Sequence, residues 1–133
     1  MALDPADLPD EVLTFLREYH LATLTTSRAD SSPHVVAVGF SYDTAQRTAR
    51  VITWAGSQKA KNAERMQAAG QRAAVCQVDG GRWLSLEGPV RLVTDPDGVK
   101  AGVDGYAARY REPAERDDRV VIEIAVERIL GRA

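Results

Sequence analysis

The chain of 133 residues has little of several residue types on which common functions depend. It has one cysteine, Cys76, so no disulfide can form within it, and two histidines, His20 and His34. A structural zinc site uses four Cys or His ligands and a catalytic one three protein ligands, so a metal site here would have to rest on carboxylates. We therefore expect no metal site. The apolar run 73–76 predicts that Cys76 is a buried, unreactive thiol.

Long apolar runs and an excess of basic charge are lacking as well. No stretch approaches the roughly 18 apolar residues of a membrane span, and the first ten residues are acidic, without the regions of a secretion signal. The formal net charge is −2, which argues against nucleic-acid binding because such binding normally rests on a basic surface. These features predict a cytoplasmic protein with neither membrane nor nucleic-acid partners.

The pattern of apolar residues predicts one domain over residues 1–133, mainly β, with six strands and three short helices. The strands are expected at 20–27, 33–40, 49–54, 72–78, 83–92 and 120–127, and the helices at 8–19, 57–69 and 95–110. Residues 42–47 and 111–118 read as polar loops. Strands and helices do not alternate strictly, so we expect a small antiparallel β-barrel with helices packed outside it rather than a parallel sheet.

Three local patterns give expectations for the core. Val12, Phe15, Leu16 and Tyr19 form one apolar stripe on the first helix. In the fifth strand the even-numbered residues 84–92 should face the core, and the odd-numbered residues, including Trp83, should share the opposite, mixed face. Tyr106 and Tyr110 are expected as core residues of the third helix.

Motifs for dinucleotides, nucleoside triphosphates, serine hydrolases and zinc proteases are absent, but one segment carries unusual charge. Ser57 suits a helix N-cap, and Lys59 and Lys61 follow it in the first turn, where acids are normally favoured. These are two of only three lysines in a chain with fourteen arginines. With Asn62 and Arg65 on nearby turns, the segment could bind a phosphate; a solvated basic face is the alternative.

Two other residues have both a structural and a functional interpretation. Trp83 is a large aromatic on a strand face that is not the core, so it could pack under a helix, lie at a subunit interface or contact a planar ligand. His34 begins a strand that we expect to be buried, where it would be a structural histidine or a ligand contact. No residue pattern marks a catalytic acid or base.

The sequence resembles the pyridoxamine-phosphate-oxidase-like split-barrel superfamily, in particular its flavin/deazaflavin oxidoreductases that use coenzyme F420. The resemblance covers essentially the full length. It is carried by residues 20–26, 32–40, 50–53, 56–65, 77–88 (ending in the run Trp-Leu-Ser-Leu-Glu-Gly) and 119–123. Within that group the chain is most similar to the F420-dependent biliverdin reductases.

This resemblance implies a split barrel that forms a homodimer with cofactor sites between subunits. The family's phosphate-binding pattern falls on Ser57, Lys59 and Asn62, with Lys61 beside them. It also implies that His34, Val36, Val38 and Thr53 lie along the deazaflavin ring and that Trp83 reaches it from the other subunit. Some relatives have an arginine where this chain has Ser57, so fewer cations would hold the phosphate or the glutamate tail.

The implied reaction is hydride transfer from reduced F420 to a conjugated acceptor, as in reduction of biliverdin, a linear tetrapyrrole, to bilirubin. Orientation of the two molecules would supply much of the rate. Two alternatives stay open. The same fold could use FMN as a pyridoxine-phosphate oxidase does, or it could bind F420 or haem without catalysis.

Overall fold

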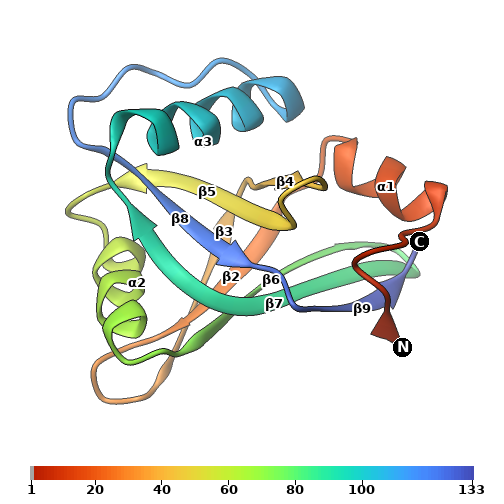
Figure 1. Ribbon diagram of the computed structural model, residues 1–133, viewed down its shortest axis with the longest axis horizontal. Coiled ribbons are helices and arrows are strands. Elements are labelled where there is room, and N and C mark those ends of the chain that lie inside the picture. The colour runs from red at the N-terminus through yellow and green to blue at the C-terminus, as the bar shows by residue number, and fades with distance from the viewer. Residues whose placement is uncertain (1) are drawn as a thin grey trace.

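The computed structural model describes residues 2–133, which form three helices and nine strands (Figure 1). The helices are α1 (Asp10–Arg17), α2 (Gln58–Ala68) and α3 (Pro96–Arg109). The strands are β1 (Ala2–Leu3), β2 (Ala22–Ser27), β3 (Pro33–Val38), β4 (Ser41–Asp43), β5 (Thr48–Trp54), β6 (Arg72–Asp79), β7 (Arg82–Val93), β8 (Arg119–Ala125) and β9 (Arg128–Arg132). None of the helices in this part of the chain is long and apolar enough to cross a membrane.

The strands form one antiparallel sheet in the order β3-β2-β6-β7-β8-β5-β4. The strand β9 adds to the first half of β7 and pairs with β1. The twelve-residue β7 joins the two halves of the sheet, because it pairs with β6 along Arg82–Pro89 and with β8 along Val90–Val93. The sheet curls around a core of buried aliphatic side chains but does not close, since β3 and β4 remain at its two ends.

The predicted antiparallel, mainly β fold is therefore confirmed, while the predicted number of six strands is wrong. β1, β4 and β9 have two to five residues each, too short to give a periodic pattern. β4 lies at the start of the expected loop 42–47. In β9, Gly131 has φ +132°, and a Cβ there would collide with the Trp83 carbonyl. Only glycine allows this close pairing of β9 with β7.

The first helix packs across one end of the curled sheet and buries Val12, Phe15 and Leu16 (Figure 1). Tyr19, expected in the same stripe, lies beyond the end of α1 and is 66% exposed. That expectation was wrong because α1 ends at Arg17. The Tyr19 ring instead meets the Tyr110 ring edge-on, with 5.0 Å between centroids.

The third helix lies on the outer side of β5 and β8 (Figure 1) and approaches them through its glycines. A Cβ added at Gly102 would lie 2.5 Å from a methyl carbon of Val121, so the glycine lets the backbone of α3 sit close to the sheet. Tyr106 and Tyr110 are half-buried rather than part of the core. The Tyr110 hydroxyl donates to the carbonyl of His20 at 2.6 Å.

The alternation expected in the fifth strand is confirmed up to Val90. Leu84, Leu86 and Val90 are buried and Trp83 has the opposite parity. Beyond that point the pattern shifts, because Leu92 is half-buried while Val93 is buried. A Cβ on Gly98 of α3 would collide with the Val93 side chain, so this helix covers the end of the strand.

Candidate functional site

The cationic segment found in the sequence forms the start of α2. Ser57 is its N-cap: the Ser57 hydroxyl accepts a hydrogen bond from the Ala60 amide at 3.2 Å. The Thr53 hydroxyl donates to the same oxygen at 2.9 Å. With both bonds accepted, the proton of the Ser57 hydroxyl is left to donate. The amides of Gln58 and Lys59, in the first turn, have no acceptor within the helix.

Asn62 and Arg65 fasten α2 to the sheet. Asn62 is fully buried; its Nδ2 donates to the Thr26 hydroxyl at 3.1 Å, and its Oδ1 accepts from Gln58 at 2.7 Å and from Arg65 at 3.3 Å. Arg65 also donates to the carbonyl oxygen of Ser27. These bonds fix the direction in which α2 begins. Direct contact of Asn62 or Arg65 with a ligand stays a prediction.

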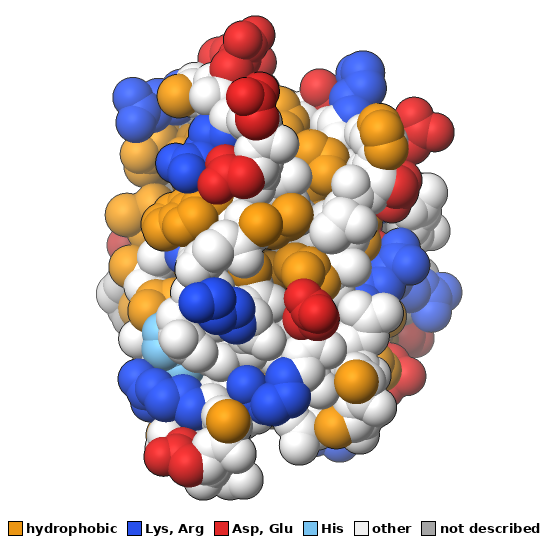
Figure 2. Space-filling view, turned by 90° about the vertical axis from the view of Figure 1, so that its left-hand side faces the viewer, with side chains coloured by type: hydrophobic (Ala, Val, Ile, Leu, Met, Phe, Trp, Pro, Cys, Tyr) orange, Lys and Arg blue, Asp and Glu red, His pale blue; other side chains and the backbone are white. Residues whose placement is uncertain are grey.

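The two lysines of the first turn are not neutralised. Within residues 2–133 no carboxylate lies within 4.0 Å of the Lys59 or Lys61 ammonium group, and the first turn of α2 contains no acid. Lys59 is half-buried, with its Nζ 5.0 Å from the centroid of the Trp54 ring. Burial lowers the pKa of Lys59. Figure 2 shows the molecular face that carries the start of α2, with several Lys and Arg side chains gathered across its lower part.

His34 lies on β3, an edge strand, so the expectation of a buried strand there was wrong. The imidazole is nevertheless turned inward, because His34 shares the parity of Val36 and Val38. Its Nδ1 is buried and has no hydrogen-bond partner among the residues that the structure describes. Burial, then the positive charges of Arg28 and Lys59, lower the pKa of His34. A neutral imidazole with one free polar atom therefore lies near the Lys59 charge.

A cavity of about 570 Å³ lies beside these residues; we call it the α3 cavity. It is bounded by the end of β3, by β5, by α3 and by the segment 111–119. Lys59 and Val38, both predicted as site residues, line it together. The other lining residues include Gly39, Ile52, Tyr106, Arg111, Glu112 and Arg119. No pattern in the sequence points to Arg111 and Arg119, because charged residues in a binding loop have the same pattern as those in a solvated turn.

Trp83 is not part of this group in a single chain. Its parity places it on the outer face of β7, opposite Val78 of β6 and Arg132 of β9. The same outer face carries Val35 and Val78, which are 56% and 65% exposed, and Cys76, which is half-buried on it. The expectation that Cys76 is buried was therefore only partly right. Burial raises the pKa of the thiol, which keeps it in the unreactive form.

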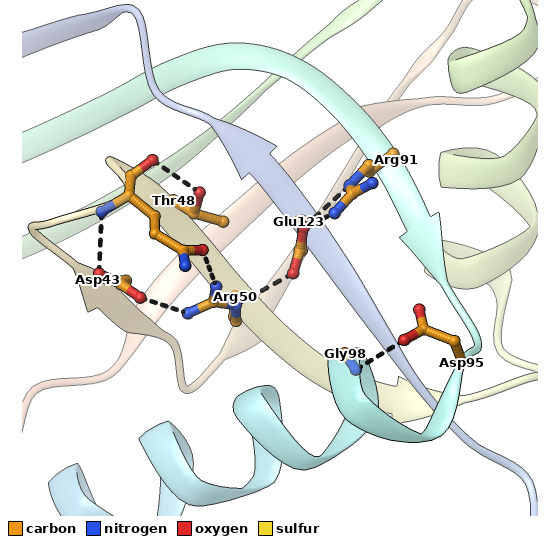
Figure 3. A network of polar contacts seen from close by, with 8 residues as sticks. Asp43, Thr48, Arg50, Arg91, Asp95, Gly98 and Glu123 are labelled. Carbon is orange, nitrogen blue, oxygen red and sulfur yellow. Dashed lines mark hydrogen bonds and ion pairs between the residues drawn. The ribbon is translucent and has the colours of Figure 1, made fainter.

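A second polar network has a structural rather than a ligand-binding arrangement (Figure 3). The buried Glu123 carboxylate accepts from Arg50 Nε at 3.1 Å and from Arg91 Nε at 2.9 Å. Arg50 also donates to Asp43 at 3.2 Å, so the network links four adjacent strands. Among residues 2–133 no three His, Cys, Asp or Glu side chains gather as metal ligands would.

Comparison with known proteins places the chain in a family. The model of the family described as pyridoxamine 5'-phosphate oxidase matches residues 8–133. The chain belongs to this family. One relative of the chain is a protein of Mycobacterium tuberculosis named F420H(2)-dependent biliverdin reductase. It is 55% identical over 126 residues, which are 95% of this chain and 89% of the relative.

Solved structures agree with this family assignment. A structure titled F420 reductase has a TM-score of 0.70 and 26% identity, over 92% of this chain and 98% of the other. A conserved hypothetical protein of Mycobacterium tuberculosis has a TM-score of 0.76 and covers 99% of this chain and 89% of its own. At 22% identity, the second likeness shows the pyridoxamine 5'-phosphate oxidase fold alone.

Proposed function

We propose that this protein is a coenzyme F420H2-dependent oxidoreductase that reduces biliverdin to bilirubin. The observation that carries the proposal is the 55% identity, over nearly the full chain, to a protein named for this reaction. The unneutralised lysines at the start of α2 support it independently, since they meet the requirement for a site that holds a phosphate-bearing cofactor.

The residues present fit the phosphate of such a cofactor. Lys59 and Lys61 have no carboxylate partner in the described part of the chain, and the Ser57 hydroxyl retains a proton to donate. The dipole of α2 adds partial positive charge at the same point. The orphaned Nδ1 of His34 is a further polar group that a ligand would satisfy. We assign phosphate binding to Ser57, Lys59 and Lys61, and positioning of α2 to Asn62 and Arg65.

The deazaflavin ring supplies hydride chemistry when it is bound. The chain's own contribution is to hold a planar ligand and to exclude water from it. Val36 and Val38 present apolar surface on β3, and Thr53 is buried on β5 with its hydroxyl engaged by Ser57. These residues would hold the ring in a fixed orientation. Part of the binding energy is then used to align the reacting carbons. The proton that completes the reaction is assigned to no residue.

The outer face around Trp83 supports a homodimer. Val35, Val78 and Trp83 place apolar side chains on a sheet surface that is partly exposed in a single chain. Exposed apolar patches of this kind mark association surfaces. A second copy packed there would cover this face and bring its own Trp83 toward the cofactor of the first copy. A cytoplasmic location also stays a prediction.

The decisive test is turnover by the purified protein. With reduced F420 and biliverdin, we expect the biliverdin absorption band to fall as a bilirubin band and oxidised F420 appear together. Matched reactions with NADPH, and with protein preloaded with FMN, should show no comparable rate. A protein that purifies yellow with tightly bound FMN, or one that binds biliverdin or haem without turnover, would refute the proposal in favour of the corresponding alternative.

A further inference from the structure

We infer that the α3 cavity binds the carboxylates of the acceptor molecule, and that Arg111 and Arg119 recognise them. The inference rests on the proposed function and deepens it, because it names residues that decide which acceptors bind. Neither arginine belongs to the predicted phosphate site, and they enter the cavity from a different part of the chain.

The charge of the cavity favours an anionic ligand. Lys59 comes from the start of α2, Arg111 from the loop after α3 and Arg119 from the first residue of β8. One acid, Glu112, lines the same space. Across the described part of the chain, no carboxylate lies within 4.0 Å of the Arg111 or Arg119 guanidinium group. When the phosphate of the cofactor is bound to Lys59, Arg111 and Arg119 remain as cations without a carboxylate partner, and cations around a concave surface raise the local concentration of anions.

The loop that carries these arginines is held in place. The Arg119 guanidinium donates to the carbonyl of Ala114 at 2.6 Å, which closes the loop on itself. Arg116 pairs with Asp118 at 2.9 Å, and its guanidinium lies 5.1 Å from the centroid of the Trp54 ring. The Ala55 amide donates to the Asp118 carbonyl at 2.9 Å and ties the loop to the residues that precede α2. A fixed loop loses little conformational freedom when a ligand binds, which favours binding.

The lining of the cavity is mainly polar but also contains apolar side chains, a combination that suits a ligand with both carboxylates and an apolar part. Val38, Ile52 and Tyr106 supply apolar surface, and the cations lie among them. Biliverdin has the same distribution, with an apolar conjugated plane and two propionate carboxylates. A guanidinium group matches a carboxylate through two parallel hydrogen bonds. The glutamate tail of F420 also carries carboxylates, but it has no apolar plane that could pack against Val38, Ile52 and Tyr106. We therefore assign the cavity to the acceptor.

The test compares biliverdin with biliverdin dimethyl ester, which keeps the conjugated plane and removes both charges. Dissociation constants are measured by absorption titration and KM values by turnover, for the unsubstituted protein and for R111Q, R119Q and R119K. R17Q is the matched control, because Arg17 is an exposed arginine on α1, outside the α3 cavity. F420 affinity is measured by fluorescence titration for every variant.

We expect R111Q and R119Q each to raise the dissociation constant of biliverdin by about threefold to tenfold, which is the effect of losing one partly exposed ion pair. The dissociation constant of the dimethyl ester should be the same for these variants as for the unsubstituted protein. R119K should recover part of the loss, and R17Q should bind like the unsubstituted protein. F420 affinity should not change. Equal losses for biliverdin and its ester would overturn the inference, and so would a loss confined to F420, which would assign the arginines to the cofactor tail.

The two proposals fail separately in this design. If biliverdin binds in a charge-dependent way but is not reduced, the proposed reaction is wrong and the carboxylate site stands. If biliverdin is reduced and R111Q and R119Q bind it as the unsubstituted protein does, the reaction stands and the carboxylate site is wrong. If the unsubstituted protein does not bind biliverdin, both are wrong.

Discussion

Removal of the Lys59 charge tests the phosphate site most directly. A charge-assisted hydrogen bond contributes roughly 1.5–3 kcal/mol when it is shielded from water. Lys59 is half-buried, so solvent reduces this value, and Lys61 and the helix amides remain to bind the phosphate. We therefore expect Lys59→Met to weaken F420 binding by about 1.4 kcal/mol, or about tenfold. Lys59→Ala should have at least as large an effect.

The choice of methionine separates loss of charge from loss of packing. Both substitutions remove the cation–π contact of the Lys59 ammonium group with the Trp54 ring, worth about 0.5–1 kcal/mol at an exposed site. The straight side chain of methionine can still pack against the ring, whereas alanine removes that packing as well. The control is Lys100→Met, which removes the third lysine, an exposed residue paired with Asp104 at 2.6 Å on α3. Its F420 affinity should match that of the unsubstituted protein in fluorescence titration.

The pH dependence of F420 binding gives a second measurement of the same residue. Burial lowers the pKa of Lys59 in the free protein below the ordinary 10.5, whereas a bound phosphate would raise it by opposite charge. Binding is then linked to proton uptake, so affinity should fall as pH rises through the lowered pKa of free Lys59. Lys59→Met should lack this alkaline decline. Equal affinity of Lys59→Met and the unsubstituted protein at pH 7 would refute the assignment of Lys59 to the phosphate.

Three further predictions concern stability and association. Glu123→Gln leaves Arg50, whose side chain is only 10% exposed, with a weaker partner and should lower the free energy of unfolding by about 2 kcal/mol in urea titration; an unchanged midpoint would contradict a stabilising role. Gly102→Ala would stabilise an exposed helix by about 1 kcal/mol, but contact with Val121 should make it destabilising by about 1–3 kcal/mol, so a raised melting temperature would contradict the close packing of α3. Trp83→Ala should shift the protein toward monomers in sedimentation and weaken F420 binding, and its role at an interface is wrong if both measurements stay unchanged.

The parts of the fold that could be predicted are those with a local signal. Alternation in β7 needs only neighbours along the strand, and the start of α2 follows from the capping chemistry of Ser57. The end of that helix follows from Gly70, which has φ +67° just after it. Such features depend on a few consecutive residues, so the sequence alone contains them.

The features that could not be predicted depend on contacts between distant residues. Arg109 is buried, and among residues 2–133 it has no carboxylate partner; it donates to the carbonyls of Glu18 and Phe40 and to the amide oxygen of Gln77, each at 2.8 Å. Nothing near residue 109 in the sequence indicates that it enters the interior. The same holds for Arg111 and Arg119, which become cavity residues only because α3 returns the chain to β5. Charged residues in a loop follow no periodic pattern, so the sequence does not indicate which way their side chains point.

The chain has two tryptophans, and they lie at different places in the molecule. The Trp54 ring contacts both Lys59 and Arg116, at the start of α2 and in the loop that carries Arg111 and Arg119. Trp83 lies on the outer face of the sheet. Each indole is therefore a built-in fluorophore for one event, ligand binding for Trp54 and association for Trp83. A protein with Trp83→Phe would report cofactor and acceptor binding through Trp54 emission alone, without an attached dye.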